Sequence, residues 1–220
     1  MTKDVCYVNV ASSHYCLAGF INYDNHVFLR FLKFPTLFYM FFPKKYFQLF
    51  NTFLDASNNF ILKKWNCKKP LPHSDNTIKH ILCSNFLEHV YETEAIVIVN
   101  DFYKKLQPGG TLHILVPDLA YYVNAYLTQK NIKGEERLAS DHLNFQTILT
   151  TKNPPSFKFR LMELIGSFGL KHLRMYDEAS ANAIFESAGF ERIALSESCP
   201  SYGYLANSPD NVHLLYKKPN

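Results

Sequence analysis

Short apolar runs alternate along this chain with longer stretches in which apolar residues recur every three or four positions. Short runs between polar breaks are typical of buried strands, and the longer spacing is typical of amphipathic helices. We predict strands over residues 5–11, 60–66, 78–84, 111–116, 190–195 and 212–216, and one more in the apolar run that ends at Asp24. This alternation favours an open α/β sheet and leaves open whether the last two strands run antiparallel.

Helices are predicted between several of these runs. One apolar stripe precedes Pro108 and the pair Gly109–Gly110, which are expected to end its helix; the members of the stripe are Ile96, Val99, Tyr103 and Leu106. A second stripe follows Asp118 and consists of Leu119, Tyr122, Val123 and Tyr126. A third helix is expected after Asp177, which can cap it, with Gly189 at its end. A helix that stops directly before a strand indicates parallel strands joined by helical crossovers.

The composition of the 220-residue chain is that of a globular protein, with 47% hydrophobic and 19% charged residues. We expect one domain over residues 1–220. The net charge of +4 and the lack of a basic run predict no nucleic-acid partner. Five scattered cysteines without a CxxC pair, and an N-terminus without a signal peptide's apolar stretch, predict a cytoplasmic protein. The nine histidines form no HExxH motif or His/Cys cluster at ligand spacing, so no metal site is expected.

Ligands of open α/β sheets bind beyond the carboxyl ends of the strands, so the residues at these ends are candidates for a binding site. They are Ala11, Ser12 and Ser13 after the first strand, Asp24 after the second, Asn66 and Cys67 after the third, Ser84 and Asn85 after the fourth, and Asp118 after the fifth. A carboxylate after the second strand suits a ribose, and an amide after the third can read an adenine edge. The alternative for Asp24 is a turn residue that closes its strand.

Four blocks of the sequence resemble one known family. They are "VNVASSHYCLAGFINYD", "KPLPHSDNTIKHILCSNFLEHV", "FYKKLQPGGTLHILVPDL" and "HLRMYDEASANAIFESAGF". In this order they are similar to the motifs of class I S-adenosylmethionine-dependent methyltransferases, above all a bacterial subgroup (methyltransferase-domain type 11-like) near surface-polysaccharide genes. The resemblance implies a Rossmann-like, open, mostly parallel sheet of about seven strands, with helices on both faces and the last strand antiparallel.

The same resemblance implies a function and a cofactor. The chain would transfer a methyl group from S-adenosylmethionine to a hydroxyl of a small molecule or of a glycan sugar. Residues Ala11–Ser13 would face the methionine part of the cofactor, Asp24 the ribose, and Asn66 and Cys67 the adenine. Ser84 and Asn85 would line the junction with the acceptor. The loop 196–211 and an aromatic-rich insert between the second and third strands would shape the acceptor pocket.

The first block departs from the family pattern at its glycines, which are Ala11 and Ser13 here. Glycine permits close approach of the backbone to a ligand and backbone angles that side chains disfavour. Asn66 replaces a usual acid, and Asn85 a usual histidine. These departures support a second hypothesis, a catalytically inactive methyltransferase-fold protein that acts as a binding or scaffolding partner. A nicotinamide-dependent oxidoreductase is disfavoured because no GxGxxG turn is present.

Three residues are candidates for catalysis, namely His89, His172 and Asp118. A histidine suits the removal of a proton from a hydroxyl, and Glu88 beside His89 offers an acid–base pair. The alternatives are structural: a carboxylate favoured near a helix N-terminus for Glu88, a helix-surface or core histidine for His89, and a helix cap for Asp118.

An aromatic-rich insert is predicted at about residues 26–58. Its segment 28–50 holds ten Phe and Tyr residues with four Lys and Arg residues and no acid. It is too short in uncharged length to span a bilayer, which takes about 20 apolar residues. Two interpretations stay open. The insert is either a helical pair packed on the sheet, or an aromatic and basic face that contacts a membrane surface or a lipid-linked sugar.

Overall fold

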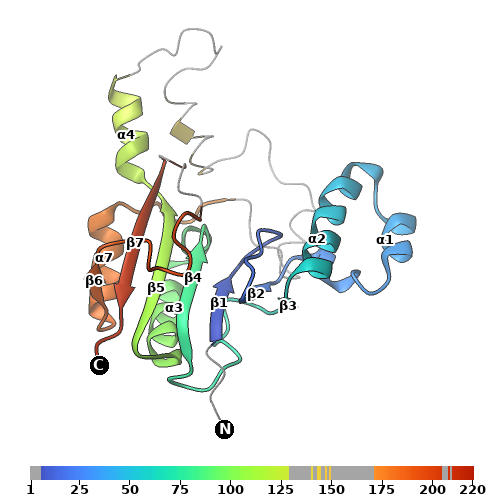
Figure 1. Cartoon of the computed structure of the whole chain (residues 1–220). Helices are drawn as coiled ribbons and strands as arrows, with labels where there is room; N and C mark the ends of the chain where they lie inside the picture. Colours follow the sequence, from blue (N-terminus) through green and yellow to red (C-terminus); the bar gives the residue numbers. More distant parts are fainter. Residues whose placement is uncertain are drawn as a thin grey trace.

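The computed structural model describes residues 6–128, 171–204 and 210–220, together with residues 140, 143, 144, 147, 149 and 208. Seven strands form one sheet in the order β3-β2-β1-β4-β5-β7-β6 (Figure 1). Their bounds are β1 Cys6–Val10, β2 Phe20–Asp24, β3 Leu62–Lys64, β4 Ile78–Ser84, β5 Leu106–Pro117, β6 Glu191–Ile193 and β7 Asn211–Lys217. All pairs are parallel except those of β7, which runs antiparallel to both β5 and β6. The predicted Rossmann-like, mostly parallel sheet is confirmed, with β7 as the reversed strand.

The order of the strands reverses between β1 and β4. From β1 the chain moves outward through β2 to β3, and it then returns to place β4 on the other side of β1, where Val10 lies opposite Cys83. At such a reversal the connections leave the sheet in opposite directions, so a crevice forms at the carboxyl ends of the two strands. This crevice holds the loops after β1 and β4.

One face of the sheet is covered by α3 (Glu92–Lys105) and α7 (Glu178–Ser187). Their buried side chains, which join the core of the strands, are Ala95, Ile98, Val99 and Phe102 in α3 and Ala181, Ile184 and Phe185 in α7. The α7 prediction is confirmed, since Asp177 Oδ1 accepts a hydrogen bond from the Ser180 amide at 2.7 Å. The α3 stripe is partly wrong, because Ile96 is exposed and the helix turns Ile98 and Phe102 inward instead.

The Pro-Gly-Gly segment lies within β5 and does not itself end α3, whose C-cap residue is Leu106. Helix α3 ends at Lys105, and β5 begins at Leu106 with a register shift between Ile78 and His80 of β4. A Cβ atom at Gly110 would lie 2.8 Å from the carbonyl oxygen of Gln107, so the tight path of this segment requires glycine there. The two glycines therefore allow the irregular backbone at the start of β5, where its register with β4 shifts.

The insert between β2 and β3 stands beyond the β3 edge of the sheet (Figure 1). It consists of η1 (Val27–Arg30), α1 (Pro35–Phe41), η2 (Lys44–Tyr46) and α2 (Phe47–Asn59). The Phe38 ring stacks between those of Phe42 and Phe50, with centroids 4.2 and 3.8 Å away. This cluster packs mainly on itself and on Leu62 of the edge strand. The insert was expected to pack on the sheet, and it contacts the sheet at the edge strand β3.

In the described part of the chain, no helix has the length and apolar character that crossing a membrane requires.

Candidate functional site

A cavity of about 380 Å³ lies at the carboxyl ends of β1 and β4, within the size range of small-molecule sites. Its lining residues are Ala11, Ser12, Ser13, Tyr15, Ser84, Asn85, Tyr204, Ser208, Asp210 and Asn211. Five of the predicted binding residues, those after β1 and β4, therefore share one cavity. The other lining residues come from the C-terminal loop and from Tyr15, and no local pattern in the sequence marks them individually.

Three residues in the loops of this cavity have the backbone conformation that glycine favours, although none of the three is glycine. Ala11, Ser13 and Asn85 have φ angles of 56°, 50° and 49°, in the left-handed region. For a residue with a side chain this conformation costs on the order of 1 kcal/mol and persists only where its surroundings impose it. The loop after β1 thus has backbone angles typical of glycine at two positions that hold alanine and serine.

Hydrogen bonds from the neighbouring strands hold these loops in place. The Ser12 amide donates to the carbonyl of Tyr23 at 3.0 Å, and the Asn85 amide donates to the carbonyl of Leu115 at 2.9 Å. Behind them lies a buried amide pair that the sequence analysis missed, in which Asn9 Nδ2 donates to Asn22 Oδ1 at 2.9 Å. Asn22 Oδ1 also accepts the Leu17 amide at 2.9 Å, so it anchors the far end of the same loop.

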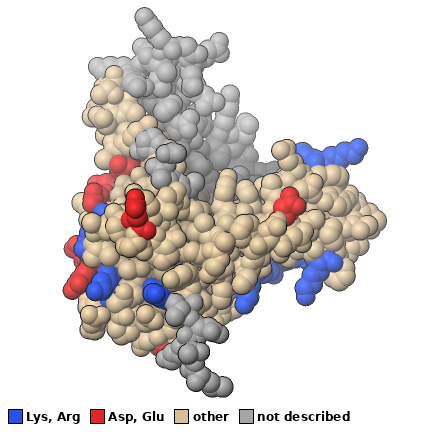
Figure 2. Space-filling view, in the orientation of Figure 1, with Lys and Arg blue, Asp and Glu red and all other residues tan. Residues whose placement is uncertain are grey.

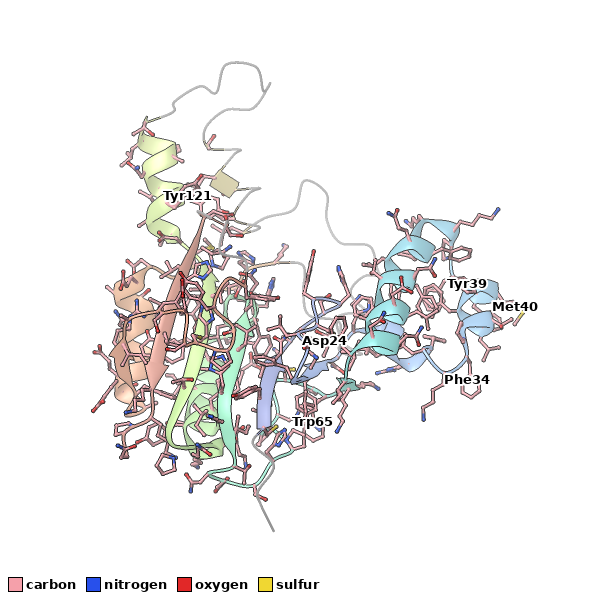
Figure 3. All side chains as sticks on the ribbon, in the orientation of Figure 1. Asp24, Phe34, Tyr39, Met40, Trp65 and Tyr121 are labelled. Atoms are coloured by element: carbon pink, nitrogen blue, oxygen red, sulfur yellow. The ribbon has the colours of Figure 1, made fainter. Side chains whose placement is uncertain are left out.

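Asp24 supports the loop after β1 from the end of β2, and it is only 4% exposed (Figure 3). Its Oδ2 accepts the Ser13 amide at 2.8 Å and its Oδ1 accepts the His26 amide at 2.6 Å. Burial raises the pKa of this carboxyl, while the hydrogen bonds from Ser13 and His26 act against that rise. Asp24 is not among the residues that line the cavity.

An aromatic ring of the insert packs against the loops that follow β1 and β2. Phe53 of α2 stacks on His26, with centroids 4.6 Å apart, and meets His14 edge-on at 5.5 Å. The insert is therefore continuous with the loops that follow β1 and β2.

Neither Asn66 nor Cys67 is among the residues that line the cavity, and the two side chains lie in different surroundings. Cys67 is 1% exposed in the core, and burial raises the pKa of its thiol. Asn66 lines a separate depression of about 300 Å³ with Asn25, Lys64, Trp65 and Lys69. Its Oδ1 accepts the Lys68 amide at 3.1 Å, which closes a turn after β3.

The two candidate catalytic histidines come together with Glu88. Glu88 and His89 lie in η3 (Leu87–His89), and the Leu173 amide donates to the Glu88 carbonyl at 2.7 Å. The rings of His89 and His172 are 4.8 Å apart, and His172 Nε2 lies 4.0 Å from Glu88 Oε1. Burial raises the pKa of Glu88 to about 8. Burial, followed by the nearby charge of His89, lowers the pKa of His172 to about 4. Desolvation thus outweighs the mutual attraction of the two groups and favours the neutral form of each when no cation is bound.

Asp118 is engaged at the start of α4 (Leu119–Thr128). Its Oδ1 accepts the Ala120 amide at 2.9 Å, and its own amide donates to the Asp210 carbonyl at 2.8 Å. A β-bridge joins it to Tyr176. These contacts are those of a helix cap, and Asp118 is not among the residues that line the cavity.

No family model and no curated protein sequence matches the chain, so its similarity to known proteins is one of structure. A chain from the complex between the Haloferax volcanii Trm112 methyltransferase activator and a methyltransferase is 10% identical. The match covers 98% of this chain and 83% of that one, with a TM-score of 0.52. A protein from Pyrococcus horikoshii is 9% identical over 99% of this chain and 84% of its own, with a TM-score of 0.51. A SAM-dependent methyltransferase from Thermotoga maritima is 14% identical over 97% of this chain and 82% of its own, with a TM-score of 0.49.

The chain has a Rossmann-like methyltransferase fold. At identities this low the likeness concerns the fold and not the activity. Within the methyltransferase fold the predicted site residues divide into separate groups. The residues after β1 and β4 line one cavity, His89 and His172 meet beside Glu88, and Asp24 ties the first loop to β2. Asn66, Cys67 and Asp118 belong neither to the cavity lining nor to the cluster of Glu88, His89 and His172.

Proposed function

We propose that this protein is an S-adenosylmethionine-dependent methyltransferase that acts on a hydroxyl of a small molecule or of a glycan sugar. The observation that carries the proposal is the left-handed path of Ala11 and Ser13 at the point where the strand order reverses. Strained backbone of this kind is retained where a site needs it, and here it borders a cavity of suitable size.

The residues around the cavity fit the methionine half of the cofactor. Small side chains at Ala11, Ser12 and Ser13 leave room for a ligand close to the backbone, and Ser84 and Asn85 would line its junction with the acceptor. The fit is weaker for the adenosine half. The two oxygens of Asp24 already accept backbone amides, and would bind ribose hydroxyls only through their second lone pairs. Asn66 would meet the adenine from its separate depression, while the thiol of Cys67 is buried.

The bound cofactor would supply a methyl group on a sulfonium, which is reactive toward an aligned oxygen nucleophile. The protein's own contribution would be alignment, because a correctly oriented pair of reactants reacts far faster than the same pair in solution. In this proposal His89 is the candidate base for the acceptor's proton, since a histidine suits proton removal from a hydroxyl. His172 is the weaker candidate, because burial lowers its pKa to about 4. We assign Asp118 only the structural role of a helix cap, because its side chain accepts a hydrogen bond from the Ala120 amide in α4.

We base the acceptor class, a hydroxyl of a small molecule or of a glycan sugar, on the resemblance to the type 11-like subgroup. The exposed face of α1 is a second argument, and it favours a glycan carried on a lipid. Met40 and Phe41 of this helix are 64% and 71% exposed, and Phe34 at its N-cap is 62% exposed. Lys33, Lys44 and Lys45 flank these apolar residues in the sequence. Figure 2 shows blue side chains on both sides of an uncharged tip at this end of the molecule. Apolar residues ringed by lysines are typical of contact with an anionic lipid surface. A glycan acceptor carried on a lipid would bring the substrate to that surface.

Calorimetry with S-adenosylhomocysteine tests the proposal directly. We expect a dissociation constant in the micromolar range for the full chain, and weaker binding by about tenfold or more for Ser13→Leu, whose side chain would enter the cavity. Lys79→Leu, on the exposed side of β4, is the matched control. No binding of S-adenosylhomocysteine up to millimolar concentration would favour the alternative, a non-catalytic protein that binds or scaffolds a partner.

A further inference from the structure

The cluster of Glu88, His89 and His172 has the composition of a metal site. One potential ligand atom from each residue lies within 4.8 Å of the other two. Two of the residues are neighbours in η3, and the third arrives from the segment after β5 and α4, held there by the Leu173 amide. None of the three lines the cavity at β1 and β4, so the cluster is a separate feature of the molecule.

The carboxylate of Glu88 lacks the partners that burial demands. The residue is fully buried, and neither oxygen has a hydrogen-bond partner in the described part of the chain. The distance of 4.0 Å to His172 Nε2 exceeds that of a hydrogen bond. The Arg174 amide donates to the Glu88 carbonyl, but the guanidinium of Arg174 pairs with Glu92. A buried carboxylate without a partner is strongly destabilising, and a bound cation is one of the few groups that offset this cost.

The orientation of His89 agrees with a ligand role. Its Nδ1 lies 3.1 Å from the carbonyl oxygen of Lys171. A proton on Nδ1 donates to that carbonyl and leaves the lone pair on Nε2. Metal-bound histidines usually have this arrangement, because a backbone carbonyl fixes the ring and its tautomer.

We propose that Glu88, His89 and His172 bind one divalent transition-metal ion, with zinc as the preferred ion. Two imidazoles and one carboxylate form the ligand set of many open zinc sites, in which the fourth position is left to water or substrate. Zinc bonds of about 2.0–2.2 Å place tetrahedral ligand atoms roughly 3.4 Å apart, so the cluster contracts by about 1 Å on binding. Side-chain rotations of this size need no movement of the strands.

The open position gives the ion a chemical use. An ion in this cluster would lower the pKa of an acceptor hydroxyl that reaches its open position, and the proton would pass to water, because both imidazoles are then ligands of the metal. This use rests on the methyl transfer proposed above, whereas the binding of the metal does not. The two proposals can therefore fail separately.

Metal uptake by the purified full chain is the test. The protein is stripped with a chelator, loaded with zinc, desalted and analysed for metal content, and the affinity is measured by calorimetry. We expect one zinc per chain for the wild type and a loss of about 100-fold or more in affinity for Glu88→Gln and for His172→Gln. The matched controls are Glu186→Gln and His73→Gln, which change the same residue types outside the cluster and should retain full uptake.

Thermal unfolding with and without zinc distinguishes lost ligation from misfolding. At a zinc concentration of about 100 times the dissociation constant, the wild-type midpoint should rise by roughly 5 °C or more, and that of Glu88→Gln should not move. The metal-free Glu88→Gln protein should be no less stable than the metal-free wild type, because the amide removes a buried acid. If Glu88→Gln does not fold, His89→Gln, at a half-buried position, replaces it. A wild type that takes up no zinc, or equal uptake by the cluster variants, overturns the proposal and leaves an unmetallated carboxyl–imidazole pair.

Discussion

The carboxylate of Asp24 accepts the backbone amide of Ser13 at 2.8 Å, and so ties the end of β2 to the left-handed loop after β1. The loop is costly to form, and this hydrogen bond is one of the contacts that impose its shape. Both oxygens of Asp24 point at backbone donors, since the other accepts the His26 amide. The residue that resembles a ribose ligand is therefore also a structural support of the cavity wall.

Asp24→Asn is expected to weaken this support. An amide side chain presents one acceptor and one donor, so either the Ser13 or the His26 amide would face an N–H group. We predict a loss of about 1–3 kcal/mol in the free energy of unfolding, measured by urea denaturation. Asp55→Asn, at an exposed position in α2, is the control and should change stability little. Equal stability of the two variants would show that Asp24 does not hold the loop.

Ala11→Gly should behave opposite to an ordinary alanine-to-glycine change. Because Ala11 has a φ of 56°, glycine relieves strain there, and this gain opposes the entropy that glycine adds to the unfolded chain. We predict unchanged stability or a gain of up to about 1 kcal/mol. Ala183→Gly on the exposed side of α7 is the matched control, with an expected loss of about 1 kcal/mol. The measurement is again urea unfolding, and losses of the same size in both variants would contradict a left-handed Ala11.

Acid should destabilise the protein through two histidines buried on the other face of the sheet. Ser201 Oγ lies 2.8 Å from His80 Nε2 and 2.7 Å from His113 Nδ1. Burial lowers the pKa of His80 to about 4, and burial together with the charge of His213 lowers that of His113 to about 3. In the unfolded chain both take up protons below about pH 6.5, so the unfolded state gains stability as the pH falls. Each histidine should cost the fold roughly 1 kcal/mol between pH 6.5 and 5.5, because the unfolded-state imidazole is already half protonated at pH 6.5.

His113→Asn isolates one of these contributions. Asparagine can place a polar atom near the position of Nδ1 and keep the contact with Ser201, yet it does not titrate. Between pH 6.5 and 5.5 the variant should lose about 1 kcal/mol less than the wild type in urea unfolding experiments. The comparison of slopes removes the effect of the other histidines, which both proteins share. Parallel pH profiles would mean that His113 is not held neutral.

The exposed face of α1 should bind anionic membranes. We predict that the chain sediments with vesicles that contain phosphatidylserine, and that Phe34→Ser together with Phe41→Ser reduces the bound fraction by about tenfold, since each serine removes a large apolar side chain from the contact. Leu127→Ser on α4, where Leu127 is 65% exposed, is the control for an unrelated apolar residue. Neutral vesicles should bind more weakly, because the lysines contribute through charge. No sedimentation with anionic vesicles would remove the membrane from the proposed function.

Local features of the fold could be read from the sequence. Each predicted strand is present, and Asp177 caps α7 as expected, because strands and caps depend on residues that are neighbours in the chain. The rotation of α3 could not be read in the same way. Ile96 and Ile98 are equally apolar, and only contact with α7 and the sheet decides that Ile98 faces inward.

For the site, the sequence alone determined which residues stand at the ends of β1 and β4, since the order of strands and a short motif place them there. Only the tertiary structure decided that Ala11 and Ser13 keep a glycine-type path, because hydrogen bonds from β2 impose it. It alone also brought His172 to Glu88, 84 positions earlier in the chain, and buried both side chains. Periodicity and spacing report on neighbours along the chain, whereas a shared cavity or ligand cluster depends on how distant segments return to one edge of the sheet.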